Sequence, residues 1–459
     1  MKKLALLVGV MLVLGFAGSA LAVEFQVHGD MNNRFMLYTN QAPLYSTSET
    51  AKSRNIDKNE ISEAWMDIKY RIWFEAASDD GKVKGVYAIE LGNIRAGDGS
   101  VLGGSTKGGA FSGDGINIET RWAYTDFQIP GVASKARITL GLMPFDVNPY
   151  FWSETAMGIR YTGAIVEPVD LTLAWIRGRE FFNTSPNDDL FADLESYTAR
   201  LDVKSVKNVP FGVFAVYQAR NPQSSQFQDY VGATDYEVKT LKTVDFSLWT
   251  LGTDGKANFG TAFVNWDLMY QTGSLTDNSA VKRDISAYFV HADVGVNIGN
   301  TRVTYTGWYA SGDDSSTDDK IKNYLATDVD MTASRVLMEG GYNDDNYFTE
   351  APYVLDKGLF LNKLAVDHKA TKKLTVGAAL LYLQTAEDLT LAGGKTSKNL
   401  GTELDAYLSY QLWPSTKLEI GGGYLWADDA MDFFEVASQR NGSSDTDIYR
   451  ADARIRYSF

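Results

Sequence analysis

The sequence contains no cysteine and only three histidines among its 459 residues. The lack of cysteine excludes disulfides, thiolate metal sites and covalent haem attachment through a C-x-x-C-H motif. Beyond an apolar stretch at the start of the chain, no run of about 18 apolar residues occurs, so the sequence predicts no membrane-spanning helix. The chain therefore needs another source of cohesion, and a continuous hydrogen-bonded sheet can supply it.

The amino-terminal stretch has the layout of an export signal. Two lysines precede an apolar stretch over residues 4–16, and an Ala-Leu-Ala tripeptide at residues 20–22 provides the small residues of a cleavage site. The pattern predicts a signal peptide over residues 1–22, removed after export. No linker or shift of composition divides the rest, so residues 23–459 are predicted to form a single domain. The formal net charge of −15 disfavours nucleic acid as a partner.

The last stretch of the chain, residues 449–459, alternates strictly between two kinds of side chain. Its odd positions are apolar or aromatic, and its even positions are polar. This period of two predicts a β-strand whose two faces meet different solvents. A membrane barrel can end on such a strand because its last strand pairs with its first.

Tight turns and long connections alternate along the chain. Residues 253–256 have the composition of a tight turn, whereas long polar or glycine-rich connections occupy residues 92–117 and 311–356. This layout predicts an all-β fold, a transmembrane antiparallel β-barrel with short periplasmic turns and long extracellular loops. The count favours 18 strands, with 16 as the alternative because residues 211–217 and 357–367 alternate less cleanly.

The strand faces that turn inward in this arrangement carry many charged residues of both signs. Burying such charges in a dry core is costly, so the pattern predicts a wide barrel with a water-filled lumen. A set of arginines on early strands is predicted to form a basic pore wall: Arg34, Arg71, Arg121 and Arg137.

The chain end and three internal stretches carry a resemblance to known barrels. Phe459, with Tyr457 and Ile455 two and four residues before it, resembles the terminal signature of Gram-negative outer-membrane β-barrels, which the barrel-assembly machinery reads in that family. The chain also resembles general porins, and more closely the trimeric porins of sulfate-reducing and related bacteria. This likeness rests on residues 141–145 (GLMPF), 401–405 (GTELD) and 421–426 (GGGYLW).

The porin resemblance implies a constriction in the pore. In that family the third loop, here residues 144–157, folds into the lumen and narrows it. Asp146 and Glu154 on this loop would face the basic wall and create a transverse field. The resemblance also implies a homotrimer, to which residues 92–115 would contribute, in contact with outer-membrane lipid and lipopolysaccharide.

We therefore expect an outer-membrane porin through which small hydrophilic solutes and ions diffuse passively, with no cofactor, metal or catalytic residue. One alternative is a substrate-specific channel, and another is a non-conducting barrel that acts as a scaffold or adhesin. An enzyme is disfavoured, because His291 and Asp293 are more simply explained as polar lumen lining. In a substrate-specific channel, inward aromatic residues would form a binding track: Trp65, Trp73, Trp308 and Tyr407.

The long connection over residues 311–356 is rich in aspartate. Carboxylate pairs of this kind can hold calcium, but no EF-hand spacing is present. A solvated surface loop is therefore the expected state of this connection.

Overall fold

The computed structural model describes residues 23–39, 62–97, 118–132, 136–179, 194–204, 206, 208–220, 245–276, 281–315, 318–329, 331–338, 351–434 and 447–459. The predicted signal peptide lies outside these ranges. Within them, no helix is long and apolar enough to cross a membrane. The described secondary structure consists of β-strands and three short 3-10 helices, η1 (Leu355–Lys357), η2 (Ala392–Gly394) and η3 (Asp429–Phe434).

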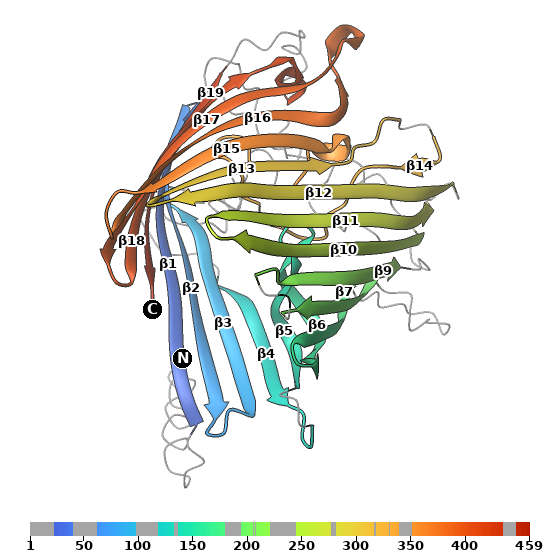
Figure 1. The fold of residues 1–459 in the computed structure, drawn as a ribbon, viewed down its shortest axis with the longest axis vertical. Coiled ribbons are helices and arrows are strands. Elements are labelled where there is room, and N and C mark those ends of the chain that lie inside the picture. The colour runs from blue at the N-terminus through green and yellow to red at the C-terminus, as the bar shows by residue number, and fades with distance from the viewer. Residues whose placement is uncertain are drawn as a thin grey trace.

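The strands differ in length but follow one another around a single sheet (Figure 1). Those of the first half of the chain are β1 (Val23–Thr39), β2 (Ser62–Ser78), β3 (Val83–Arg95), β4 (Ile118–Gln128), β5 (Arg137–Asn148), β6 (Trp152–Val166), β7 (Val169–Arg179), β8 (Leu194–Val203) and β9 (Phe211–Arg220). Those of the second half are β10 (Asp245–Phe259), β11 (Ala262–Thr276), β12 (Lys282–Ile298), β13 (Thr301–Ala310), β14 (Lys320–Ile321), β15 (Leu359–Lys369), β16 (Leu374–Thr390), β17 (Thr396–Trp413), β18 (Thr416–Ala427) and β19 (Ile448–Ser458).

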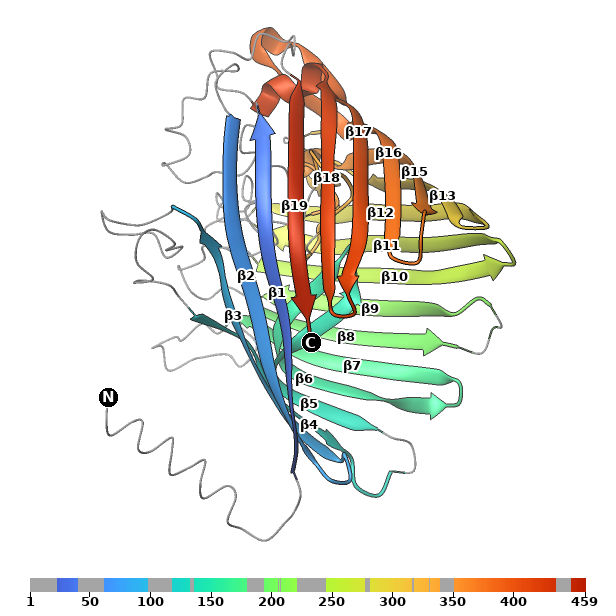
Figure 2. The same ribbon diagram turned by 90° about the vertical axis from the view of Figure 1, so that its left-hand side faces the viewer.

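The sheet closes on itself. Each wall strand pairs antiparallel with its neighbours in the chain, and β1 pairs with both β2 and β19, which lie beside it in Figure 2. The two-residue β14 stands apart from this ring, because β13 pairs directly with β15. The described strands thus form an eighteen-stranded barrel, which confirms the larger predicted count and excludes sixteen. The segments that alternate poorly in the sequence form the wall strands β9 and β15.

The wall strands present one face to lipid and the other to the lumen. On β2, Met66 is 48% exposed on the outer face, whereas its neighbours Trp65 and Asp67 are 6% and 1% exposed on the inner face. On β19, Tyr449 and Ile455 point outward in the same way. Apolar side chains tolerate exposure on this outer face because its solvent is hydrocarbon. The predicted two-faced pattern is therefore confirmed in the strand that closes the barrel.

One predicted tight turn, which contains Gly255, is part of a strand in the structure. Residues 253–256 were expected to form a tight turn, but they lie inside β10, and the chain turns only after Phe259. A Cβ atom at Gly255 would come within 2.4 Å of the Trp266 indole on the neighbouring strand. Gly255 therefore provides room for an aromatic side chain rather than a turn, so the turn prediction was wrong.

The last residue of the chain packs over a glycine of the first strand. The backbone N–H of Gly29 donates to the Phe459 carbonyl at 2.9 Å, and the Phe459 N–H donates back at 3.0 Å. A Cβ atom at Gly29 would lie 2.4 Å from the Phe459 ring. On the lumen side of the same seam, the Arg456 guanidinium pairs with Asp30. Barrel closure thus combines a backbone pair, a ring over a glycine and an ion pair.

We predict that Gly29→Val weakens this closure. The added side chain displaces the Phe459 ring, and overpacking of this kind costs about 1–3 kcal/mol of the free energy of unfolding. A urea titration of the refolded protein in detergent, followed by tryptophan fluorescence, measures the change. Gly85→Val on the outer face of β3 is the matched control, because no heavy atom lies within 4 Å of that Cβ position. Equal unfolding midpoints for the two variants would contradict the prediction.

Candidate functional site in the lumen

The hairpin formed by β5 and β6 leaves the wall and enters the lumen. Pairing of β5 with β4 stops at Leu142, and pairing of β6 with β7 begins only at Gly158. The residues in between pair with each other, and the turn itself is short, over residues 149–151. The inward element is therefore a hairpin that continues two strands, rather than the long loop that the sequence suggested.

The hairpin tip reaches the wall formed by β10, β11 and β12. The Asn148 side chain donates to Asp267 at 2.7 Å and to Asp254 at 3.2 Å. Asp267 also bonds to the His291 ring at 2.7 Å, and the Tyr150 ring lies over that imidazole with the ring centroids 4.5 Å apart. The tip is thus held by polar side chains that an open channel wall would expose to water.

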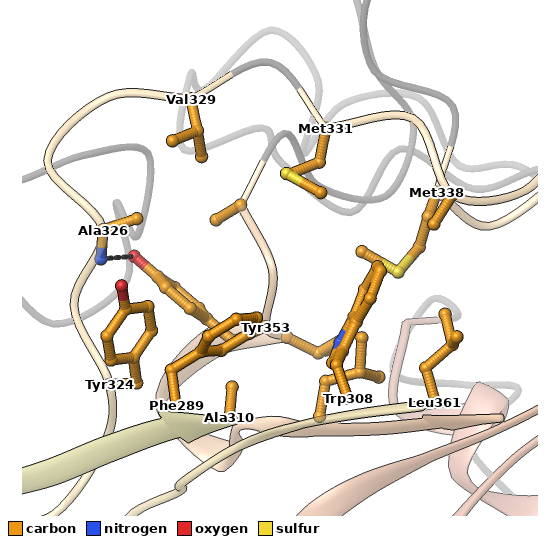
Figure 3. Close-up of a cluster of buried hydrophobic side chains, with 14 of the residues drawn as sticks. Phe289, Trp308, Ala310, Tyr324, Ala326, Val329, Met331, Met338, Tyr353 and Leu361 are labelled. Carbon is orange, nitrogen blue, oxygen red and sulfur yellow. Dashed lines mark hydrogen bonds between the residues drawn. The ribbon is translucent and has the colours of Figure 1, made fainter. Parts of the chain in front are cut away.

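The described residues of a second segment between β13 and β15, which are 311–315, 318–329, 331–338 and 351–358, also fold into the lumen. Its side chains pack in a cluster with wall residues of β12, β13 and β15 (Figure 3). Tyr324 and Tyr353 are fully buried there, and the Tyr353 hydroxyl accepts a hydrogen bond from the Ala326 N–H at 3.2 Å. The expectation of a solvated surface loop was therefore wrong for the described part of this segment. Apolar runs such as Val336-Leu337-Met338 outweigh its aspartates.

The two inward segments join into one inner body. The Thr327 N–H donates to the Phe151 carbonyl at 2.7 Å, and the Ser153 N–H donates to the Asp328 carbonyl at 2.8 Å. The Tyr324 hydroxyl adds a bond to the Tyr150 carbonyl at 3.1 Å. This inner body fills the lumen beside β9–β13 and β15–β16, where wall side chains such as Leu361 are fully buried.

The structure describes only some of the aspartates that suggested a calcium site. Asp330, Asp344 and Asp345 lie outside the described residues. Within the described part of the chain, no three acidic or histidine side chains gather in a way that could hold a metal ion.

The opposite wall carries charged side chains that remain partly exposed inside the barrel. The Arg71, Arg121 and Glu154 side chains are 30%, 21% and 24% exposed, in contrast to the buried wall behind the inner body. These groups belong to what we call the charged strip, which follows β2–β4, β18 and β19: Lys69, Arg71, Glu90, Arg121, Glu419, Arg454 and Arg456, with Glu154 from the hairpin.

Three cations gather around one carboxylate at mid-height of the charged strip. Glu90 lies 3.3 Å from the Lys69 ammonium, 2.5 Å from Arg71 Nε and 3.2 Å from Arg121 Nη1. The other terminal nitrogen of Arg121 lies 3.1 Å from Glu154 on the hairpin. We call these five residues the Glu90 cluster. It holds three positive and two negative groups.

The structure separates the four predicted arginines into three places. Arg71, Arg121 and Glu154 meet in the Glu90 cluster. Arg34 is buried against Asp67 at 2.6 Å, and Arg137 pairs with Asp126 at 2.5 Å close to the turn after β2. The four arginines thus each have a carboxylate partner nearby and do not form one bare row that faces the hairpin.

Asp146 points to the other side of the hairpin. It lines a cavity of about 570 Å³ near the short-turn ends of β7–β11. Within this cavity the Arg200 guanidinium bonds Asp254 at 2.6 and 2.7 Å, Asp202 at 2.8 Å and the Val147 carbonyl at 2.9 Å. With Arg200 saturated, the cavity presents an excess of carboxylates, including Asp146 and Asp267.

The four aromatic residues proposed as a track do not form one. Trp308 lies in the buried cluster of the inner body, and Tyr407 lies beside Arg335. Trp73 stacks on His28 near Trp122, and Trp65 lies under Arg95. Sequence analysis also missed Arg335 as a lumen residue, although an arginine directly before the apolar run Val336-Leu337-Met338 could have indicated a buried ion pair.

The architecture defines the class: an eighteen-stranded outer-membrane β-barrel with a partly filled lumen. No protein-family model and no curated protein matches the chain. Solved structures of Pseudomonas aeruginosa barrels do match it. OpdL aligns with a TM-score of 0.55 at 11% identity, covering 95% of this chain and 99% of that one.

Two further barrels from the same organism give the same picture. OccK2 (OpdF) aligns at 12% identity and OpdK with vanillate at 10%, each with a TM-score of 0.52 and coverage of 95% of this chain and 98% of the other. At this distance the similarity shows the fold, which resembles that of the OprD and Occ barrels. The sequence resemblance pointed instead to general porins.

We predict that Asn148→Ala loosens the hairpin tip. Loss of its two hydrogen bonds to buried carboxylates costs about 1–2 kcal/mol, equivalent to roughly 5- to 30-fold faster amide exchange if the tip opens locally. Hydrogen–deuterium exchange of residues 143–157 measures the effect. Asn297→Ala, at an exposed turn, is the control. Unchanged protection of the hairpin in the Asn148 variant would show that these bonds do not hold it.

Proposed function

We propose that the chain is an outer-membrane channel that selects small organic anions. The observation that carries this proposal is the Glu90 cluster, where three cations face two carboxylates on a part of the described lumen wall that the inner body leaves partly exposed. A solute that passes the inner body on this side has to pass these groups. In a narrow lumen with low-dielectric walls, an excess positive charge raises the local concentration of anions.

The geometry of the Glu90 cluster favours rapid exchange of a bound anion over its tight retention. Arg121 is shared between Glu90 and Glu154, so an entering carboxylate has to compete with fixed carboxylates for the same guanidinium. The acidic cavity near Asp146 and Asp254 then disfavours retention of an anion at the short-turn end, which the sequence assigns to the periplasm. Conduction requires this balance, because a solute has to leave as readily as it enters.

The comparisons support a selective channel over a general pore. The OprD and Occ proteins that share this fold are substrate-specific channels, and one of the matching structures, OpdK, was solved with vanillate, an aromatic carboxylate. The sequence first suggested a general porin. A general porin differs from a selective channel because its flux rises linearly with solute concentration. The homotrimer, the contacts with lipopolysaccharide and assembly machinery, and the export signal stay predictions.

We predict that the wild-type channel is anion-selective and that single charges of the Glu90 cluster set this selectivity. In a planar bilayer under a salt gradient, Arg121→Gln should shift the reversal potential towards cations and Glu154→Gln towards anions, each by roughly a twofold change in permeability ratio. Opposite shifts are expected because the two variants remove opposite charges from the same ion pair.

Lys82→Gln is the matched control for charge removal outside the lumen. Lys82 lies at the exposed turn after β2, where its hydrogen bond to Asp80 lowers the pKa of that carboxyl to about 2. Its removal should leave the reversal potential unchanged. A cation-selective wild type, or identical shifts in both cluster variants, would be incompatible with the proposal. Block of the current by millimolar vanillate, used as a probe anion, would separate a selective channel from a general porin.

A further inference from the structure

One side chain fastens the inner body to the wall at the edge of the charged strip. We infer that Arg335 is a positioning residue that holds the described residues 327–329 and 331–335 as a strut across the lumen and thereby sets the largest solute that the channel passes. This inference rests on the proposed channel function and concerns solute size, whereas the Glu90 cluster concerns charge.

The strut connects opposite walls. At one end, the Thr327 hydroxyl donates to Gln218 on β9 at 3.2 Å. At the other end, Arg335 reaches Asp452 on β19. These two strands are nine positions apart in either direction around the eighteen-stranded ring. Eight residue steps cover at most roughly 27 Å, so the chain between the two contacts has to run almost directly across.

The backbone of the strut is held by two buried carboxylates of β17. Glu403 is fully buried and accepts hydrogen bonds from the N–H groups of Arg335, Val336 and Leu337 at 2.9, 2.7 and 3.2 Å. Asp405, which is 2% exposed, accepts a further bond from the Arg335 N–H at 3.1 Å. Carboxylates buried at these positions are otherwise unfavourable, which indicates that the wall is built to receive this chain segment.

The Arg335 side chain then crosses β18 to a third carboxylate. Its Nη1 atom lies 3.0 and 3.1 Å from the two oxygens of Asp452, which is buried on β19. The guanidinium passes 5.4 Å from the centre of the Tyr407 ring. The arginine therefore links three adjacent wall strands to the strut.

Two glycines of β18 leave space beside the Arg335 side chain. A Cβ atom at Gly421 would lie 2.9 Å from the Arg335 guanidinium carbon, and one at Gly423 would lie 3.0 Å from the Arg335 Cβ. Neither residue has a positive φ angle, so the backbone does not require glycine there. Space for the Arg335 guanidinium is the physical reason for glycine at 421, whereas at 423 the closest atom is Asp405 Oδ1 at 2.4 Å, so glycine there leaves space for Asp405 and the backbone it holds.

The test measures pore size in the refolded full chain. We expect Arg335→Leu and, independently, Gly421→Val to raise single-channel conductance at least twofold, because each releases the strut by a different route. In liposome swelling, both variants should admit raffinose or stachyose at rates that the wild type allows only for smaller sugars. Arg335→Lys keeps the charge and should restore part of the wild-type limit.

Arg302→Leu is the matched control, since this arginine lies exposed near the short-turn end of β13 against Phe263. A conducting wild type whose size limit is the same in the Arg335 and Gly421 variants would overturn the inference and leave the proposed channel intact. A silent wild type in the bilayer would instead overturn the channel itself, and the strut with it.

A disulfide tests the same inference by replacing the anchor that Arg335→Leu removes. The chain has no cysteine, so Val336→Cys with Gly423→Cys introduces a unique pair. The Cβ position of Gly423 lies 2.9 Å from a Val336 methyl, which places the two sulfurs within bonding reach. In the Arg335→Leu variant, where Arg335 no longer holds the strut, the oxidised pair should restore the wild-type size limit, and reduction should widen the pore reversibly. Equal conductance in both redox states would contradict a strut that sets pore width.

Discussion

Backbone hydrogen bonding in a membrane is the constraint on which this structure depends. Every N–H and C=O group that faces hydrocarbon has to be paired within the protein, and a sheet satisfies this only when it has no free edge. The pairing of β1 with β19 removes that edge. The contact of Phe459 with Gly29 and the ion pair of Arg456 with Asp30 belong to this requirement, because they hold the last strand to the first.

Closure of eighteen strands creates a lumen wider than wall side chains can fill. The protein fills much of it with two of its own connections rather than leaving a uniform aqueous pore. The β5–β6 hairpin and the described part of the connection between β13 and β15 pack on each other through backbone bonds such as that from Thr327 to Phe151. The inner body therefore has an apolar core of its own, and the charged strip lies on the opposite wall of the barrel.

The position of the inner body explains why ion pairs on the two sides of the lumen differ in their exposure to solvent. Around the inner body, charges such as Glu403 and Asp452 are buried and have donors from a single inward segment. Along the charged strip, Arg71 and Arg121 share one carboxylate and retain contact with solvent. Buried pairs of the first kind fix structure, whereas partly exposed pairs of the second kind can exchange partners with a solute.

The sequence by itself determined the two-faced strands and the closed all-β class, because a period of two records which solvent each side chain meets. It could also nominate Arg71, Arg121 and Glu154, since inward parity and loop order are local properties. Only the tertiary structure decided that these three meet around Glu90, that Asp146 faces a different cavity, and that Gly255 accommodates Trp266 rather than a turn. The role of Arg335 was equally hidden, because its partners lie 68 to 117 residues away in the chain. Such contacts depend on barrel closure and on how a connection folds back inside it, and no local pattern records either.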